Sequence, residues 1–199
     1  MENPQPAGSA RLFQNKYLDR LSRSPRPIVI WLIYMPFIIF LLAYAFQTIA
    51  PITITTLFGG GVFAWTLFEY LFHRFVFHFK SNFTCVKQFI YTIHGCHHHY
   101  PKDATRLMFP PAGSLLISSV LMSIFYLLLH MNILAFAPGF MFGYLIYDSM
   151  HYAMHMYPTP PFQFLKPLWK RHYMHHYVND DVNFGISSSF WDYVFRTKK

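Results

Sequence analysis

Residues 28–50 read IVIWLIYMPFIIFLLAYAFQTIA, an unbroken run without a single charged side chain. As a helix, a run of this length crosses a hydrocarbon core of about 30 Å. Pro36 lies inside the run and predicts a kink rather than a break. The run is longer than the apolar part of a signal peptide, and no small-residue cleavage site follows it. We therefore interpret it as a membrane span.

Three further apolar runs follow, at about 56–72, 112–134 and 139–156. Their only acidic or basic residues are Glu69 and Asp148. We expect turns at 51–55 and 135–138. The sequence thus predicts an all-α integral membrane protein with four transmembrane helices in two hairpins, separated by a polar insertion. The alternative is a soluble protein with four buried helices, but a chain of 199 residues leaves too little polar sequence to cover them.

The composition agrees with a membrane-embedded domain. Charged residues make up 12% of the chain, against about a quarter in a typical soluble domain, and aromatic residues make up 21%. High hydrophobicity with low charge excludes an intrinsically disordered chain. The two cysteines are too few for a disulfide scaffold or a cysteine-based zinc module.

The distribution of basic residues predicts the orientation. All 16 Lys and Arg lie in 1–27, 73–111 and 153–199, and neither predicted turn contains one. The positive-inside rule then places both termini and the insertion in the cytoplasm. We interpret the net charge of +8 as a consequence of this membrane orientation, and we expect no nucleic-acid partner. The expected organisation is a cytoplasmic N-terminal segment at 1–27 and one membrane-embedded domain at 28–199.

Eleven of the twelve histidines occur in four tight groups, all on the side of the membrane that the charges assign to the cytoplasm. His130 stands apart, and we interpret it as an ordinary hydrogen-bonded residue. The charge argument made no use of histidine positions, so the agreement is independent. The groups are HRFVFH (73–78), HGCHHH (94–99), HYAMH (151–155) and HYMHH (172–176).

The spacing within these groups is typical of metal ligation. Neutral imidazole is a common metal ligand, and helical residues at i, i+3 and i+4 share a face, as in HYAMH and both HxxHH motifs. In HRFVFH the spacing is i, i+5, which is about 140° on an ideal helix. Either the helix unwinds there, or His73 and His78 serve different metals. About ten ligands exceed the capacity of one ion, so we predict two metals with about five histidines each.

Two carboxylates lie within the predicted spans, close to these histidines. Glu69 is four residues before His73, and Asp148 is three residues before His151. A metal-bound histidine usually donates its other N–H to a carboxylate or carbonyl. Carboxylates inside a membrane are candidates for function, although some only extend toward the interface. We predict that Glu69 and Asp148 orient the nearby histidines.

The ordered motifs resemble the fatty acid hydroxylase/sterol desaturase superfamily. Within it, the sequence is most similar to fatty acid 2-hydroxylases, which act on the acyl chains of sphingolipids. The resemblance covers about residues 69–197 and the hydrophobic pattern upstream. Arg196 stands where the family often has glycine, so we expect the last turn to differ. The segments on which the resemblance rests are HRFVFH, HGCHHHYPKDATRLMFPP, HYAMH, KRHYMHHY, NFGIS and FWDYVFRT.

The resemblance implies a di-metal oxygenase with a cytoplasmic histidine-rich cap over four transmembrane helices. It implies hydroxylation of C2 of an acyl chain with O₂ and two electrons. The implied metals are two irons, and zinc would be an inactive substitute. His99 follows the HxxHH motif and is not one of the implied metal ligands. The implied ligands are His73, His78, His94, His97, His98, His151, His155, His172, His175 and His176.

The sequence departs from the well-known eukaryotic members, which carry a fused cytochrome b5 domain. About 27 residues precede the first span, and none is a histidine that would ligate haem. We therefore expect a separate electron donor, either cytochrome b5-like or ferredoxin-like. A short form of this kind is expected in a bacterial inner membrane. In a eukaryote the same topology would indicate the endoplasmic reticulum.

Two alternative functions remain open. The first is a sterol or carotenoid oxidase or desaturase of the same superfamily, although carotenoid hydroxylases lack the PKDATRLMFPP and FWDYVFRT segments. The second is a non-enzymatic membrane protein that binds or transports metal. A transporter would place its ligands near the bilayer midplane, whereas these histidines cluster at one end of the predicted spans.

Overall fold

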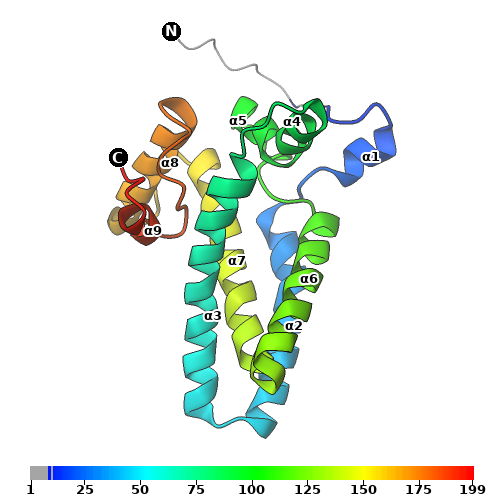
Figure 1. Ribbon diagram of the computed structural model, residues 1–199, viewed down its shortest axis with the longest axis vertical. Helices are drawn as coiled ribbons and strands as arrows, with labels where there is room; N and C mark the ends of the chain where they lie inside the picture. Colours follow the sequence, from blue (N-terminus) through cyan, green and yellow to red (C-terminus); the bar gives the residue numbers. More distant parts are fainter. Residues whose placement is uncertain (1–8, 10) are drawn as a thin grey trace.

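The computed structural model describes residue 9 and residues 11–199, and every regular element in that part of the chain is helical. Four long helices form an elongated bundle, and shorter helices gather at one end, where the C-terminus also lies (Figure 1). The long helices are α2 (Pro27–Thr48), α3 (Pro51–Phe72), α6 (Pro111–Leu129) and α7 (Ile133–Met156).

The segments at that end form what we call the cap: residues 11–26, 73–110 and 157–199. A short 3₁₀ turn, η3 (His130–Asn132), connects α6 to α7. The cap elements are α1 (Lys16–Leu21), η1 (His73–Phe77), α4 (Thr84–Ile90), η2 (Tyr91–Gly95), α5 (Cys96–His99), η4 (Gln163–Leu165), α8 (Lys166–Tyr177) and α9 (Phe190–Val194).

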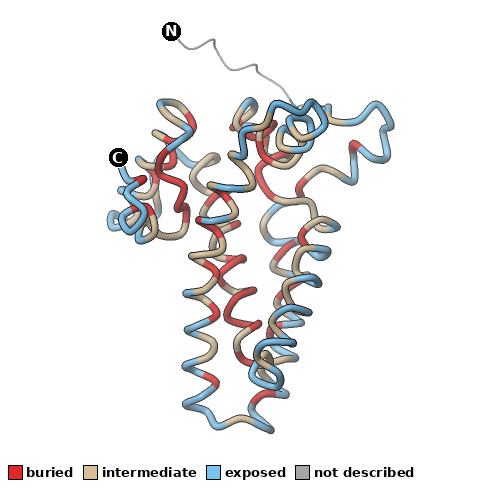
Figure 2. Tube along the Cα trace, in the orientation of Figure 1, coloured by how far each residue is buried: buried red, intermediate tan, exposed pale blue. Residues whose placement is uncertain are grey.

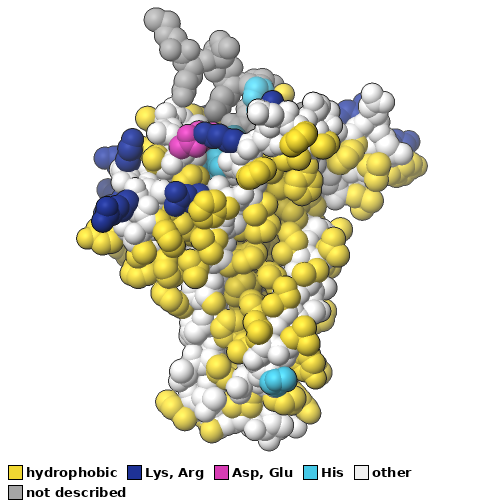
Figure 3. Space-filling model, in the orientation of Figure 1, with side chains coloured by type: hydrophobic (Ala, Val, Ile, Leu, Met, Phe, Trp, Pro, Cys, Tyr) yellow, Lys and Arg dark blue, Asp and Glu magenta, His cyan; other side chains and the backbone are white. Residues whose placement is uncertain are grey.

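Three helical stretches of the described chain are long and apolar enough to cross a membrane: Pro27–Thr48, Pro51–Phe77 and Pro111–Met156. The third stretch contains both α6 and α7, joined through η3. Apolar side chains cover the shaft of the bundle, while the basic side chains in view lie on the cap (Figure 3). This is the surface expected of a helical bundle in contact with lipid.

The four predicted helices are present, but both predicted turns were wrong. The first hairpin turns at residues 49–50, and residues 51–55 form the start of α3. Pro51 suits the first turn of a helix because that position needs no N–H bond. The second hairpin turns at His130–Asn132, and residues 135–138 lie within α7. Pro138 is tolerated there because packed neighbours in a bundle compensate for its missing hydrogen bond.

Close packing of α3 against α7 forms the centre of the bundle, where the buried residues follow the length of α7 (Figure 2). Gly61 and Gly139 make this contact possible. A Cβ atom on Gly61 would collide with the backbone of Phe136 and Phe140, and one on Gly139 with the backbone of Phe58. The helices therefore approach at backbone distance, which fixes the position of the histidines at their cap ends.

We predict that Gly61→Leu destabilises the bundle strongly, because the new side chain must push two backbones apart. Overpacking of this kind typically costs about 1–3 kcal/mol or more. Gly60→Leu is the matched control, since a Cβ atom there meets no atom within 4 Å. The measurement is the melting temperature of the detergent-solubilised protein. Equal melting temperatures for the two variants would contradict the packing argument.

Candidate metal centre

The structure gathers the ten predicted histidines into two groups of five, and within each group the candidate ligand atoms lie within 4.8 Å of one another. Two histidines lie outside both groups: His99 is exposed, and His130 lies in η3. The first group contains His73, His78, His94, His98 and His175. The second contains His97, His151, His155, His172 and His176.

Each HxxHH motif contributes to both groups. In each motif the first and last histidines, spaced i, i+4, enter one group, and the middle histidine enters the other. The middle residues are His97 and His175. The rings of His98 and His176, from different groups, stack with centroids 4.1 Å apart. The two groups are therefore neighbouring halves of one centre.

A local change in helix geometry reconciles His73 with His78. Residues His73–Phe77 form a π-helix, and the backbone N–H of His78 donates to the carbonyl of His73 at 3.1 Å. This i→i+5 bond brings the two residues to the same side of the chain. The winding of the helix therefore changes here, as one of the two expectations had it, and both histidines belong to the first group.

Backbone carbonyls set the orientation of two rings in the first group. The carbonyl of Phe184 lies 2.6 Å from Nδ1 of His73, and that of Val182 lies 2.7 Å from Nδ1 of His175. A carbonyl only accepts hydrogen bonds, so each Nδ1 carries the proton. The Nε2 atom of both rings is then left with a free lone pair that faces the other histidines.

The distances between these lone pairs fit metal ligation. Nε2 of His94 lies 3.2 Å from Nε2 of His73 and 2.9 Å from that of His98. Two imidazole nitrogens that bind one ion at about 2.1 Å, at right angles, are about 3.0 Å apart. In the second group, Nε2 of His97 lies 3.1 Å from that of His176. The donor set therefore fits two ions.

Burial keeps the imidazoles of the cap neutral. It lowers the pKa of His94, His97 and His98 well below the usual range, and neighbouring imidazoles lower the pKa further. The pKa of His78 falls to about 3, first because of burial and then because of His175. Neutral imidazole is the form that binds metal, so these rings need not lose a proton to do so near neutral pH.

Glu69 is buried but does not bond directly to His73. Its carboxylate accepts the backbone N–H of Ile186 at 2.6 Å and of Ser187 at 2.9 Å, together with the hydroxyl of Ser187. It thereby holds the loop whose Phe184 carbonyl orients His73. Asp148 is also buried, and its Oδ2 has no hydrogen-bond partner among the described residues. The roles of both carboxylates stay predictions.

Asp192 was not singled out from the sequence, although it holds the same loop. It is fully buried and accepts the backbone N–H of Phe184 and of Gly185, each at 2.8 Å. It also accepts the hydroxyl of Thr197 at 2.8 Å. Its position between aromatic residues in FWDYVFRT was the available signal, because a carboxylate amid apolar residues is either exposed or hydrogen-bonded.

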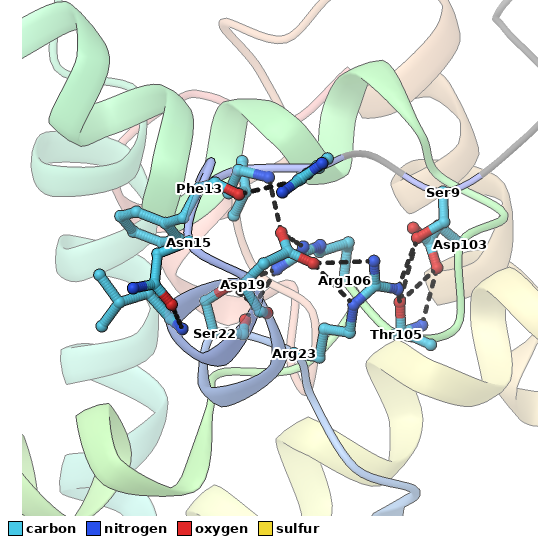
Figure 4. Close-up of polar contacts among 12 residues, drawn as sticks. Ser9, Phe13, Asn15, Asp19, Ser22, Arg23, Asp103, Thr105 and Arg106 are labelled. Atoms are coloured by element: carbon cyan, nitrogen blue, oxygen red, sulfur yellow. Dashed lines mark hydrogen bonds and ion pairs between the residues drawn. The ribbon is translucent and has the colours of Figure 1, made fainter.

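A second polar cluster ties the N-terminal segment to the cap (Figure 4). The carboxylate of Asp19 binds the guanidinium of Arg106 at 2.7 Å and that of Arg23 at 3.0 Å. Burial opposes ionisation of Asp19, but the N–H of Leu12 and the two arginines outweigh it and lower its pKa to about 2. We call this cluster the clasp, because it joins α1 to the segment at 101–110.

Two cavities meet beside the histidines. The first, about 890 Å³ with its open mouth, runs between α3, α6 and α7 and is lined by His94, His97 and His151 at its cap end. The second, about 860 Å³ with its mouth, lies between α1 and the segments at 92–97 and 106–113. Arg106 and Phe109 are among the residues that line both. The clasp therefore holds part of the wall between the cavities.

Residues 58–197 match the family described as "Fatty acid hydroxylase". The chain belongs to this family. The visible hydroxylase domain of a solved structure, full-length scs7p, superposes on it with a TM-score of 0.89 at 34% identity, covering 97% of this chain and 73% of that one.

Two similar proteins are named as hydroxylases, which agrees with membership of this family. The "Ceramide very long chain fatty acid hydroxylase SCS7" of Saccharomyces cerevisiae is 36% identical over 197 residues, which are 96% of this chain and 50% of the relative. The "Dihydroceramide fatty acyl 2-hydroxylase FAH2" of Arabidopsis thaliana is 35% identical over 190 residues, 94% of this chain and 79% of the relative. The chain thus spans about half the length of the yeast relative.

Arg196 has a structural explanation within this hydroxylase fold. Its φ is 58°, a left-handed conformation that glycine adopts without steric cost and other residues adopt rarely. The last turn therefore keeps the conformation that suits glycine while carrying an arginine. This turn therefore differs from the family pattern in its side chain, while its backbone conformation is one that suits glycine.

We predict that the purified hydroxylase domain holds two metal ions per chain. His94→Ala and His176→Ala each remove a nitrogen from one group, so each variant should retain fewer ions. His99→Ala is the matched control, since that imidazole lies outside both groups and should leave the content unchanged. Elemental analysis of gently purified protein measures the result. A reproducible value of one or none in active protein would exclude two metals.

Proposed function

We propose that this protein is a membrane-embedded di-metal lipid hydroxylase. It would insert one oxygen atom of O₂ into a C–H bond at C2 of an acyl chain. The other atom would leave as water, with two electrons from a donor and two protons from solvent. The observation that carries the proposal is the first cavity, which is apolar along the bundle and ends at histidines of both groups. A hydrocarbon chain in this cavity would lie beside a centre that fits two metals.

Iron is the metal we propose for this centre. Imidazole suits iron and zinc alike, but zinc has no redox chemistry, so a zinc form would be inactive. When bound, the two ions would supply the redox chemistry that activates O₂. The protein's own contribution is to hold neutral imidazoles in place through the carbonyls of Val182 and Phe184. Asp192 and Glu69 in turn hold the backbone of residues 184–187.

The position of the centre favours C2 over other carbons. The histidines lie at the cap end of the bundle, where a lipid headgroup and its carbonyl would meet the membrane surface. With the carbonyl held there, the C2 hydrogens are the first acyl C–H bonds below it. Holding the reacting atoms in place is a large part of catalysis, since effective molarities reach roughly 10⁵ M or more. Aromatic side chains such as Phe72 and Tyr147 line this end and keep water out.

A sphingolipid such as a ceramide is the substrate class we propose. Such a lipid has two hydrocarbon chains, and two cavities meet beside His94 and His97. The acyl chain would occupy the first cavity, and the second chain would enter the other along the apolar side chains of Leu12 and Leu18. The yeast and plant relatives that are named for ceramide and dihydroceramide support this assignment.

We further propose that all four long helices span the membrane, with the cap and the segment at 1–27 in the cytoplasm. Electrons would come from a separate cytochrome b5-like or ferredoxin-like partner. A bacterial inner membrane is the proposed location, or the endoplasmic reticulum in a eukaryotic host. The support is that neither hairpin turn, at 49–50 or 130–132, contains Lys or Arg.

Cysteine labelling tests this orientation. Cys85 is exposed on the cap and Cys96 is buried, so a membrane-impermeant thiol reagent should label the native protein only after the membrane is opened. In a Cys85→Ser background, Asn132→Cys places a thiol in the opposite turn and should be labelled in intact cells. Labelling of native Cys85 in intact cells would invert the proposed orientation.

The reaction is tested with isotopic oxygen. We expect a 2-hydroxy acyl lipid that carries label from ¹⁸O₂ and none from labelled water, read by mass spectrometry of the lipids of an expressing host. His94→Ala and His176→Ala should abolish the product, and His130→Ala should keep most of it. A double bond, an oxidised sterol or a mid-chain alcohol as the main product would overturn the C2 assignment. Full activity of the first two variants would overturn the site.

A further inference from the structure

The first cavity has a defined length along the bundle. Its lining residues lie between 114 and 122 on α6, between 140 and 151 on α7, and between 65 and 72 on α3. Each set recurs at helical spacing and so occupies one face of its helix. The cavity begins at the histidines and stops at the level of Leu121, Met122 and Phe140.

Aromatic side chains fill the bundle where the cavity stops. The ring of Phe125 on α6 lies 5.1 Å from that of Phe136 and 5.0 Å from that of Phe140, both on α7. The ring of Trp65 on α3 lies 5.1 Å from that of Phe140. Phe125 and Phe136 do not line the cavity, so they pack behind its end. We call Phe125, Phe136 and Phe140 the aromatic floor.

On three sides of this space, specific contacts join the helices. Gly61 and Gly139 bring α3 and α7 together at the level of the floor, leaving no room for a chain to pass between them. On another side, the hydroxyls of Tyr34 on α2 and Ser118 on α6 lie 2.9 Å apart. Phe125 attaches α6 to α7 at the bottom. A chain that follows α7 from the cap therefore meets the floor at its end.

We infer that the aromatic floor sets an upper limit on the length of the acyl chain that this protein hydroxylates. The inference rests on the proposed function, because it assumes that the acyl chain lies in the first cavity with C2 at the histidines. Phe140 is 11 residues before His151 on one helix, which is about 16 Å. Carbon–carbon bonds of about 1.5 Å advance an extended chain by roughly 1.3 Å each. The cavity thus accommodates roughly 12 carbons beyond C2.

The test compares variants that lengthen and shorten the cavity. Phe140→Ala removes a ring of about 4 Å from the end of the cavity, which is room for roughly three more carbons. The double variant Phe125→Ala/Phe140→Ala also removes the ring that packs behind it. Met122→Trp adds volume at the same level and should exclude the longest chains that the wild type accepts. Tyr126→Ala is the matched control, because Tyr126 neighbours Phe125 but is 56% exposed on the outside of α6.

Each protein is expressed in a host supplied with fatty acids of even chain length from 12 to 24 carbons, and the 2-hydroxy acyl lipids are profiled by mass spectrometry. We expect wild type and Tyr126→Ala to share one cutoff, the two ring-removing variants to shift it upward, and Met122→Trp to shift it downward. Melting temperatures identify any variant that has lost its fold. Met122→Trp tests the aromatic floor without opening a void in the core.

The acyl lipids that co-purify with each protein provide a second readout that needs no turnover. If the wild type yields no 2-hydroxy product while the co-purifying chain lengths still shift with the floor variants, the proposed function fails and the length limit holds. If 2-hydroxy product forms with the same chain-length distribution in every folded variant, the length limit fails and the function holds. Identical co-purifying lipids in all variants would likewise overturn the inference.

Discussion

The convergence of ten neutral imidazoles is the constraint on which the rest of the structure depends. Nine of their Nε2 atoms lie 2.7–3.3 Å from another imidazole Nε2, while Nε2 of His151 has no such neighbour. Seven of the ten rings are buried and three are partly buried. Lone pairs at that distance repel unless a cation lies between them, and leaving such polar atoms buried and unpaired costs free energy. The backbone must therefore hold the rings together by bonds made elsewhere, in an arrangement that could hold two ions.

Those bonds form successive layers around the histidines. Carbonyls of Val182 and Phe184 orient two rings, and the loop that carries Phe184 hangs from Glu69 on α3 and Asp192 on α9. Residues 184–187 therefore link α9 to the cap end of α3. A carboxylate that touches no histidine still affects histidine geometry here, because the loop transmits its position.

The sequence predicted the parts that depend on periodicity and chemistry, and missed those that depend on local backbone geometry. Apolar run length located the four long helices. The histidine spacing indicated two metal sites, and the resemblance to the hydroxylase family indicated which ten histidines would form them. The turn positions were missed because Pro51 and Pro138 look like breakers, although each is accommodated in a helix. The division of each HxxHH motif between two groups was missed as well. It depends on how η2 and α5 lie against α8, and the spacing within one helix does not contain that information.

Because of the π-helix at His73–Phe77, the geometry of this segment depends on the number of residues between the two histidines rather than on their identity. Its wide turn corresponds to an α-helical turn with one residue inserted. Deleting any residue between the two histidines would restore α-helical spacing, still with both rings on one face. The polypeptide after His78 would then be rotated by about 100° around the helix axis and displaced by about 1.5 Å along it. Substitutions between the histidines preserve this register, whereas insertions and deletions redirect the polypeptide that builds the cap.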